Sequence, residues 1–375
     1  MTAASAPLLS IVIPTRERVE TLASAIATAV DQRSRRFEIV VCDNHSQDGT
    51  RRLVEGIADP RVRYVNPGAR LSMSDNWEFA LRHAEGRHVL FIGDDDAIMP
   101  GAIDRLEPLL ESCASPIFTW PRATYMWPTA GGGARSGGVP PSRPRREIDI
   151  RALAQSVLRR GGYGFQRPPS VYHAVFHRDV LAAIGDRAGR VFLTTQPDVF
   201  VAFAAPGVTR RALSLEFLVT VLGHSEKSNG GGVAAGPATA RQRWQQLMDE
   251  HGAAPLHPSL FPGVPDRVNL ISDTLLAAKD LFPEAYGTTR FGYAEMWAYD
   301  YRLRDYLGWD TSWMAIVRQR RAIRRYQPFS LGRFLAASAF HESAMRTRRL
   351  RHGRGADWAA CTAPTIAEYV RGIAG

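Results

Sequence analysis

The stretch Val89-Leu90-Phe91-Ile92-Gly93-Asp94-Asp95-Asp96 decides the fold of this chain. Its apolar half is short enough for a buried strand, and it ends abruptly in three consecutive carboxylates. In an open α/β sheet, ligands bind at the carboxyl ends of the strands. Three adjacent acids repel one another there, and a divalent cation that prefers oxygen ligands, Mg²⁺ or Mn²⁺, would remove the repulsion. A solvated acidic turn is the alternative interpretation.

Segments of alternating type surround this stretch. The apolar pattern predicts buried strands over 8–13, 37–42, 62–65 and 88–93, and helices over 20–32, 48–58 and 74–84. Strands and helices that alternate in short units indicate an α/β fold, with a mostly parallel sheet and helices on both faces.

Polar groups follow three of these strands, at Thr15 to Glu17, at Asp43-Asn44 and at Asp94 to Asp96. In a parallel sheet these strand ends lie on one edge. The chain contains neither G-x-G-x-x-G nor G-x-x-x-x-G-K-[ST]. We therefore expect any bound nucleotide to be held by carboxylates, a cation and basic residues.

The composition is that of an ordinary globular protein of 375 residues with a net charge of +10. Such a charge attracts phosphates, anionic lipid or nucleic acid, and it does not choose among them. The three cysteines, Cys42, Cys113 and Cys361, lack metal-ligand spacing and are expected to be reduced thiols. Residues 1–10 lack the pattern of a signal peptide, and no apolar stretch reaches the roughly 18 residues of a membrane span. We expect a cytoplasmic protein.

Three motifs together resemble glycosyltransferase family 2. They are Ile11-Val12-Ile13-Pro14-Thr15-Arg16-Glu17-Arg18, the segment from Ile39 to Thr50 (IVVCDNHSQDGT), and Phe91 to Gly101. The similarity covers about residues 8–225. It implies the GT-A fold, a Rossmann-like sheet, and the use of nucleotide-sugar donors with inversion at the sugar carbon.

The resemblance also assigns residues to the donor. Asp43 would contact the nucleoside, and Pro14, Thr15 and Glu17 would shape its pocket. Asp94 and Asp95 would contact the ribose and the metal-bound diphosphate, with Asp95 and Asp96 as ligands of Mn²⁺ or Mg²⁺. The family motif is often D-x-D-D, and this chain departs from it at Gly93.

Two residues beyond the acids have a role implied by the resemblance. Asp198 would be the general base, although Pro197 replaces the Glu that usually precedes it. Read locally, Asp198 is a helix N-cap or first-turn residue. His224 would lie near the donor phosphates or the metal, and a structural histidine is the alternative.

The domain organisation follows from composition. A catalytic domain is expected over residues 1–237, with a flexible Gly- and Pro-rich insertion at about 129–146. Residues 238–375 are expected to form a helical region rich in Arg and aromatic residues. That region could contact a membrane peripherally, pack on the catalytic domain, or pair with a second subunit in a homo-oligomer. No module for nucleic acid is present.

The expected function is metal-assisted transfer of a sugar from a nucleoside diphosphate sugar to an acceptor hydroxyl. The acceptor would be a carbohydrate or a lipid-linked saccharide, in bacterial surface polysaccharide or glycolipid synthesis. A sugar-phosphate nucleotidyltransferase is a second hypothesis, disfavoured because the turn 14–18 contains no Gly. A non-catalytic nucleotide-sugar-binding protein is a third.

Overall fold

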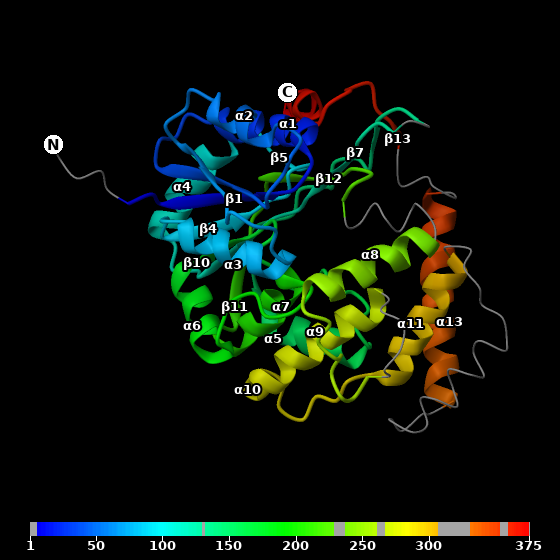
Figure 1. Ribbon diagram of the computed structural model, residues 1–375. Coiled ribbons are helices and arrows are strands. Elements are labelled where there is room, and N and C mark those ends of the chain that lie inside the picture. The colour runs from blue at the N-terminus through cyan, green and yellow to red at the C-terminus, as the bar shows by residue number, and fades with distance from the viewer. Residues whose placement is uncertain are drawn as a thin grey trace.

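The computed structural model describes residues 6–129, 132–228, 237–260, 267–306, 331–352 and 359–374. An eight-stranded sheet forms its centre, in the order β3-β2-β1-β4-β10-β6-β11-β9 (Figure 1). Within it, β1, β2, β3 and β4 are mutually parallel, and β10 and β9 run antiparallel to their neighbours. The strands are β1 (Leu9–Thr15), β2 (Phe37–Asp43), β3 (Val62–Val65), β4 (His88–Phe91), β6 (Ile117–Thr119), β9 (Arg146–Asp149), β10 (Val175–His177) and β11 (Arg211–Ser214).

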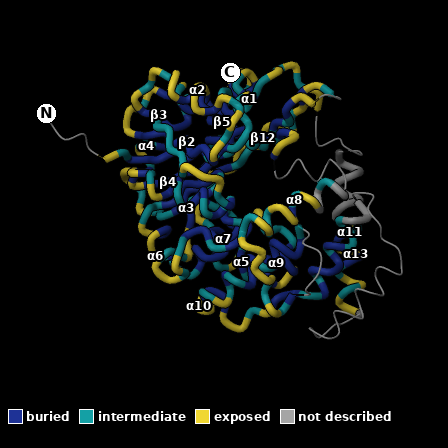
Figure 2. Tube along the Cα trace, viewed as in Figure 1, coloured by how far each residue is buried: buried dark blue, intermediate teal, exposed yellow. Residues whose placement is uncertain are grey.

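Helices cover both faces of this sheet, as expected for an α/β fold. Successive residues of a strand point to opposite faces. Val12 of β1 accordingly belongs to one apolar cluster, with α3 (Met73–His83), α5 (Ile150–Arg159) and α7 (Pro197–Ala204). Ile11 and Ile13 belong to another, with α1 (Val19–Val30), α2 (Thr50–Glu55) and α4 (Ala102–Ser112). Figure 2 shows the buried strands between these layers. The helix α6 (Arg178–Ala188) adds Val180, Leu181 and Ile184 to the first cluster.

A smaller sheet of five strands, in the order β13-β8-β7-β12-β5, lies beside the carboxyl edge of the main sheet (Figure 1). Its strands are β5 (Ala97–Ile98), β7 (Ala123–Met126), β8 (Arg135–Ser136), β12 (Thr220–His224) and β13 (Ala359–Ala360). Strand β8, within the insertion predicted at 129–146, pairs with β7 and β13, and the flexibility of that insertion stays a prediction. A strand of two residues is too short to leave a recognisable pattern in a segment rich in Gly and Pro.

The C-terminal helices pack on the rest of the chain. They are α8 (Pro237–Glu250), α9 (Arg267–Leu281), α10 (Pro283–Tyr286), α11 (Tyr293–Tyr306), α13 (Leu331–His352) and α14 (Ile366–Ala374). Helix α9 contacts α7, and α14 returns to α1 and β5 at the top of Figure 1. Within the helical region expected over 238–375, the pattern also predicts a helix over 312–325, which lies outside the described residues. The domain boundary at 237 stays a prediction. None of the helices that the structure describes is long and apolar enough to span a membrane.

Two helix starts differ from the prediction by a few residues. Ser72, rather than Ser74, caps α3 and accepts a hydrogen bond from the Asp75 N–H. Gly49, rather than Asp48, directly precedes α2, and the Asp48 carboxylate accepts the Thr50 N–H at the start of α2 and also the Val19 N–H at the start of α1. Side chains therefore cap helices across loops, which local spacing does not reveal.

Candidate active site

The acidic turn lies where the sequence placed it, at the carboxyl end of β4, and all three of its carboxylates are buried. Asp94 is neutralised from the loop after β1. Its Oδ2 accepts the Thr15 hydroxyl at 2.7 Å, and its Oδ1 lies 2.8 Å from a guanidinium nitrogen of Arg18. Asp94 and Asp95 in turn raise the pKa of the Arg18 guanidinium against the opposing effect of burial.

Asp96 is the most fully bonded of the three acids. Its Oδ1 accepts the Gly223 N–H at 2.7 Å, and its Oδ2 accepts the Gly93 N–H at 2.5 Å and the Tyr172 hydroxyl at 2.7 Å. The Nε2 of His173 lies 3.0 Å from the same Oδ2. Although burial opposes it, this set of partners, His173 foremost, holds the pKa of Asp96 below its usual range. Asp96 is therefore an anion fixed by protein donors.

Asp95 has the least compensated charge. Its Oδ2 accepts the N–H and the hydroxyl of Ser225, at 3.0 and 2.7 Å. Among the described residues, no hydrogen bond reaches its Oδ1. Burial and the two neighbouring carboxylates raise the pKa of Asp95 to about 7. The backbone carbonyl of Asp95 accepts the Trp127 indole N–H at 2.8 Å, which holds the residue in place. Within the part of the chain that the structure describes, no cationic side chain forms an ion pair with the Asp95 carboxylate.

These surroundings fit a divalent cation at Asp95. A cation would offset the charge that burial and two neighbouring anions oppose. The described residues contain no group of three or more acidic, His or Cys side chains arranged to hold a metal by themselves. Mg²⁺ and similar ions are often held by one or two carboxylates together with substrate phosphates, and one free carboxylate oxygen suits that arrangement.

The neighbouring strand ends complete the edge. Asp43, opposite Thr15 in the register of β1 and β2, accepts the Ser46 N–H at 3.0 Å and the Tyr64 hydroxyl at 2.7 Å. Pro14 lies one residue earlier, opposite Cys42. Glu17 accepts the Gln47 N–H at 2.8 Å and so joins the loops that follow β1 and β2. The structure thus brings Pro14, Thr15, Glu17, Asp43 and the acidic turn to one edge.

Asp198 lies in the same electrostatic environment. It follows Pro197, the first residue of α7, and Gln196 is the N-cap. Burial raises the pKa of Asp198, and backbone N–H groups at the start of α7 and the guanidinium groups of Arg122 and Arg267 oppose the rise. Arg122 also interacts with Asp96, so it links Asp198 to the acidic turn.

His224 ends β12, directly between Gly223, which binds Asp96, and Ser225, which binds Asp95. Burial lowers the pKa of its imidazole, while the charge of Asp96 opposes this effect. The structure therefore brings His224 to the acids, and its role as a metal or phosphate ligand stays a prediction.

Helix α8 closes the rim of the site. Glu250 at its end accepts hydrogen bonds from Arg16 at 3.2 Å and from Arg70 at 2.6 Å. Arg243 on the same helix donates to the backbone carbonyls of Glu226 and Ser228, each at 2.9 Å. The loops after β1 and after β12 are thereby tied to the C-terminal region.

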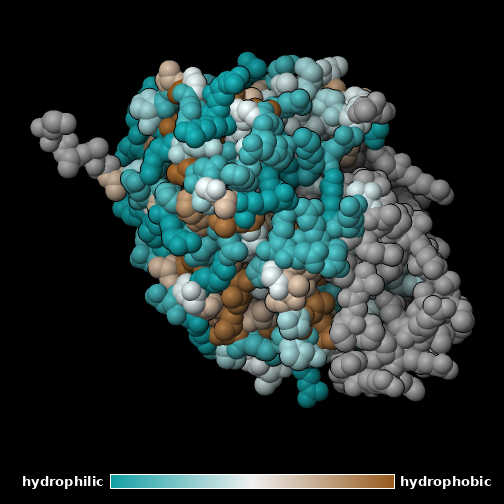
Figure 3. Space-filling view, viewed as in Figure 1, coloured by the Kyte–Doolittle hydropathy of each residue, from teal (hydrophilic) through white to brown (hydrophobic). Residues whose placement is uncertain are grey.

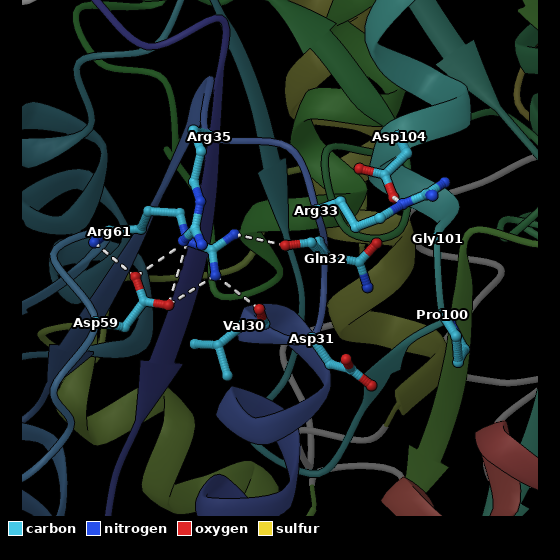
Figure 4. Close-up of a pocket in the computed structure, with 10 residues that line it drawn as sticks. All are labelled: Val30, Asp31, Gln32, Arg33, Arg35, Asp59, Arg61, Pro100, Gly101 and Asp104. Atoms are coloured by element: carbon cyan, nitrogen blue, oxygen red, sulfur yellow. Dashed lines mark hydrogen bonds and ion pairs between the residues drawn. The ribbon is translucent and has the colours of Figure 1, made fainter.

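A separate polar pocket of about 610 Å³ lies at the opposite, amino edge of the strands (Figure 4). Arg61 fills much of its wall, where it pairs with Asp59 at 2.6 Å and donates to the carbonyls of Val30 and Gln32. Its guanidinium is thus occupied by protein acceptors. The face of the molecule in Figure 3 is largely hydrophilic where it is drawn in colour.

Sequence reasoning missed four residues that shape the site: Arg18, Tyr172, His173 and Ser225. Arg18 is the last residue of a motif that was recognised, and Ser225 directly follows His224, so proximity was an available signal. Tyr172 and His173 fall in a segment predicted as a strand, whereas β10 begins only at Val175. Nothing in the local pattern distinguishes these two from core residues.

Part of this chain is similar in sequence to known glycosyltransferases. Residues 10–157 match the family model described as "Glycosyl transferase family 2". The GalNAc(5)-diNAcBac-PP-undecaprenol beta-1,3-glucosyltransferase of Campylobacter jejuni is 33% identical over 103 residues, which are 27% of this chain and 33% of that protein. The UDP-Glc:alpha-D-GlcNAc-diphosphoundecaprenol beta-1,3-glucosyltransferase WfgD of Escherichia coli is 29% identical over 89 residues, which are 24% of this chain and 35% of that protein.

The chain thus spans about a third of the length of these curated relatives. Among solved structures, S. aureus TarS 1–349 in complex with UDP-GlcNAc is similar with a TM-score of 0.47 and 14% identity, over 91% of this chain and 92% of that one. The sheet and its two helical layers confirm the predicted α/β fold, and the family match over residues 10–157 agrees with the resemblance seen in the motifs.

Proposed function

We propose that this chain, whose residues 10–157 belong to glycosyl transferase family 2, transfers a sugar from a nucleoside diphosphate sugar to an acceptor hydroxyl with inversion. The observation that carries the proposal is the meeting of Thr15, Asp43 and the acidic turn at one sheet edge, with Asp198 nearby. Asp43 would bind the nucleoside, and Pro14, Thr15 and Glu17 would form the wall of its pocket.

The reaction is a displacement at the anomeric carbon. The acceptor hydroxyl attacks as the nucleoside diphosphate leaves, and Asp198 accepts the hydroxyl proton. Burial raises the pKa of Asp198. That rise brings its basicity closer to the working pH, which favours a general base. Asp95 would hold Mn²⁺ or Mg²⁺, with His224 beside it. When bound, such a cation neutralises negative charge on the leaving diphosphate.

The acceptor is proposed from the relatives. Two of them are named for transfer to saccharides linked to diphosphoundecaprenol. We propose a lipid-linked saccharide as acceptor, in surface polysaccharide or glycolipid synthesis in a bacterium. Helix α13 exposes Leu335 and Phe340, each at least half accessible, and these apolar side chains suit peripheral contact with the membrane that carries such a lipid.

A transfer assay tests the proposal. Nucleotide sugars with different bases are offered with a lipid-linked saccharide acceptor, with Mn²⁺, with Mg²⁺, and with EDTA. Transfer that is lost in EDTA and inverts the anomeric configuration supports the function. Binding of nucleotide sugars without transfer or hydrolysis under every condition would favour a non-catalytic binding protein, and formation of a nucleotide sugar from a sugar phosphate would favour a nucleotidyltransferase.

A further inference from the structure

A chain of buried polar side chains lies behind the acidic turn. The Trp120 indole Nε1 is 2.8 Å from the Thr220 hydroxyl, and that hydroxyl is 2.7 Å from Nδ1 of His173. The other ring nitrogen of His173, Nε2, lies 3.0 Å from Oδ2 of Asp96. Thr220, His173 and Asp96 are at most 1% exposed. The chain connects the core to an acid of the proposed active site.

The direction of these hydrogen bonds follows from their chemistry. An indole N–H can only donate, whereas a hydroxyl has one proton and two lone pairs. The Thr220 oxygen accepts from Trp120, and its own proton is free to point at Nδ1 of His173. Nδ1 is then an acceptor, so the proton of the neutral imidazole sits on Nε2.

The contact with Asp96 leads to the same tautomer. Oδ2 of Asp96 already accepts from Gly93 and Tyr172, and a bare Nε2 would set lone pair against lone pair. The Nε2 contact departs from ideal alignment, and Asp96 is the one partner that the described residues offer to this buried nitrogen.

The backbone supports a specific role for His173. Its φ is +61°, in the left-handed region of backbone conformation that residues other than glycine rarely adopt. Its N–H donates to the Phe91 carbonyl at 3.0 Å, next to the acidic turn. Strained residues of this kind persist where the surrounding structure determines them, and they gather at functional sites.

We propose that His173 is a positioning residue, locked as the Nε2–H tautomer by Trp120 and Thr220. In this state it holds the Asp96 carboxylate as an anion, on which the N–H groups of Gly93 and Gly223 converge. The Gly93 contact closes the acidic turn, and the Gly223 contact fixes that turn against β12 and so fixes Asp95 beside Ser225. The effect on turnover rests on the proposed function, whereas the tautomer does not.

¹⁵N NMR of the histidine-labelled full chain at neutral pH tests the tautomer directly. We expect the wild-type His173 ring to be neutral with its proton on Nε2. Thr220→Ser keeps the hydroxyl and should keep this signature. Thr220→Val removes the hydroxyl, and we expect the Nδ1–H tautomer of His173 to become populated. Trp120→Phe is a second variant, because the Thr220 hydroxyl is no longer oriented by the indole N–H and the share of the Nε2–H tautomer should fall. A wild-type ring protonated on Nδ1, or on both nitrogens, would overturn the proposal.

Kinetics test the positioning role. Thr220→Val should lower turnover by roughly 10- to 100-fold, the range seen when an outer-shell partner is lost, and Thr220→Ser should restore it. Ser272→Ala, which removes a buried hydroxyl on α9 that has no hydrogen-bond partner among the described residues, is the control and should have a small effect on turnover. Unchanged tautomer and turnover in Thr220→Val would contradict the proposal. A locked tautomer in a wild-type protein that transfers no sugar would contradict the proposed function instead.

Discussion

Three adjacent aspartates have three different environments in this protein. Arg18 neutralises Asp94, and four neighbouring groups surround the carboxylate of Asp96. Asp95 has only Ser225 on one oxygen, and its pKa is raised to about 7 by burial and by its neighbours. The acid that should respond most to a cation is therefore the middle one.

Cation binding at Asp95 should depend on pH, because a cation binds the carboxylate and displaces its proton. With a pKa of about 7, affinity for Mn²⁺ in the presence of a nucleoside diphosphate should rise roughly tenfold between pH 6 and pH 8 and then level off. Asp95→Asn should remove this dependence and most of the affinity. Calorimetry at several pH values measures both. Asp104→Asn, at the amino edge, is the control, and a flat pH profile in the wild type would refute the assignment.

The stability of the fold should show the opposite trend at Asp95. A pKa that is higher in the folded than in the unfolded state means that stability present at low pH is lost as pH rises toward 7. Asp95→Asn should therefore melt at a higher temperature than the wild type at pH 8, and the advantage should shrink toward pH 4. Melting curves across this range check the prediction. A variant that is less stable than the wild type at pH 8 would contradict it.

Asp43 should recognise the nucleoside independently of the sugar. Its carboxylate faces the edge and is oriented by Ser46 and Tyr64. Asp43→Ala should weaken nucleoside diphosphate binding by about 1.5–3 kcal/mol, the contribution of a hydrogen bond to a charged group. Tyr64→Phe, which removes one orienting contact and keeps the carboxylate, should have a smaller effect. Equal affinity of Asp43→Ala and the wild type in calorimetry would exclude this role.

At this scale the sequence predicted the acids well and their partners poorly. A polar residue directly after an apolar run marks a strand end, and this rule located Thr15, Asp43 and the acidic turn. Arg18 and Tyr172 reach the same acids through tertiary packing across separations of 76 residues each. No periodicity or spacing in the sequence around Arg18 or Tyr172 predicts such a contact.

The element that completes the site is β12, which runs directly against the acidic turn. A Cβ at Gly223 would lie 1.7 Å from the Asp95 carbonyl oxygen, so only glycine permits this approach. The strand thereby delivers the Gly223 N–H to Asp96 and Ser225 to Asp95.

Gly223→Ala should accordingly displace β12 and impair both donor binding and stability. A clash with backbone cannot be relieved by a side-chain rotation, and overpacking typically costs about 1–3 kcal/mol. Gly332→Ala on α13 is the control, because nothing lies within 4 Å of its added Cβ. Chemical denaturation and nucleotide binding measure the two effects. A Gly223→Ala protein with wild-type stability and affinity would show that β12 does not pack as described.

The elements were predicted with uneven success, for physical reasons. Long periodic segments such as α1 and α3 were predicted within one or two residues. Strands of two or three residues, such as β5 and β8, are too short to show a period and exist because neighbouring strands pair with them. The helix α14 was not predicted, although its apolar residues Ile366, Tyr369 and Val370 are buried.

At the scale of the whole molecule, the C-terminal helices pack against the N-terminal part of the chain. Helix α14 packs against α1, and its residues join the apolar cluster of the first strands (Figure 1). Helix α9 likewise packs on α7, which carries Asp198. The C-terminal region expected from residue 238 therefore supports the catalytic fold, while its contact with a membrane or a second subunit stays a prediction.

Ile366→Ala tests whether the packing of α14 on the rest of the chain contributes to stability. The side chain is fully buried, so truncating it should cost about 2–5 kcal/mol of unfolding free energy. Phe340→Ala, at an exposed position of α13, should change stability little and should instead lower binding to anionic vesicles if that helix meets the membrane. Denaturation curves check the first expectation. A loss below ~0.5 kcal/mol for Ile366→Ala would mean that α14 is not part of the core.

The central claim is that Asp198 accepts a proton in a glycosyl transfer, and the turnover of Asp198→Asn tests it most directly. Asparagine has nearly the size and shape of aspartate and fits the first turn of α7, but it cannot accept the proton. We predict that turnover falls by roughly 10²-fold or more while nucleoside diphosphate affinity and melting temperature stay close to those of the wild type. Turnover of Asp198→Asn within a few-fold of the wild-type value would contradict the account.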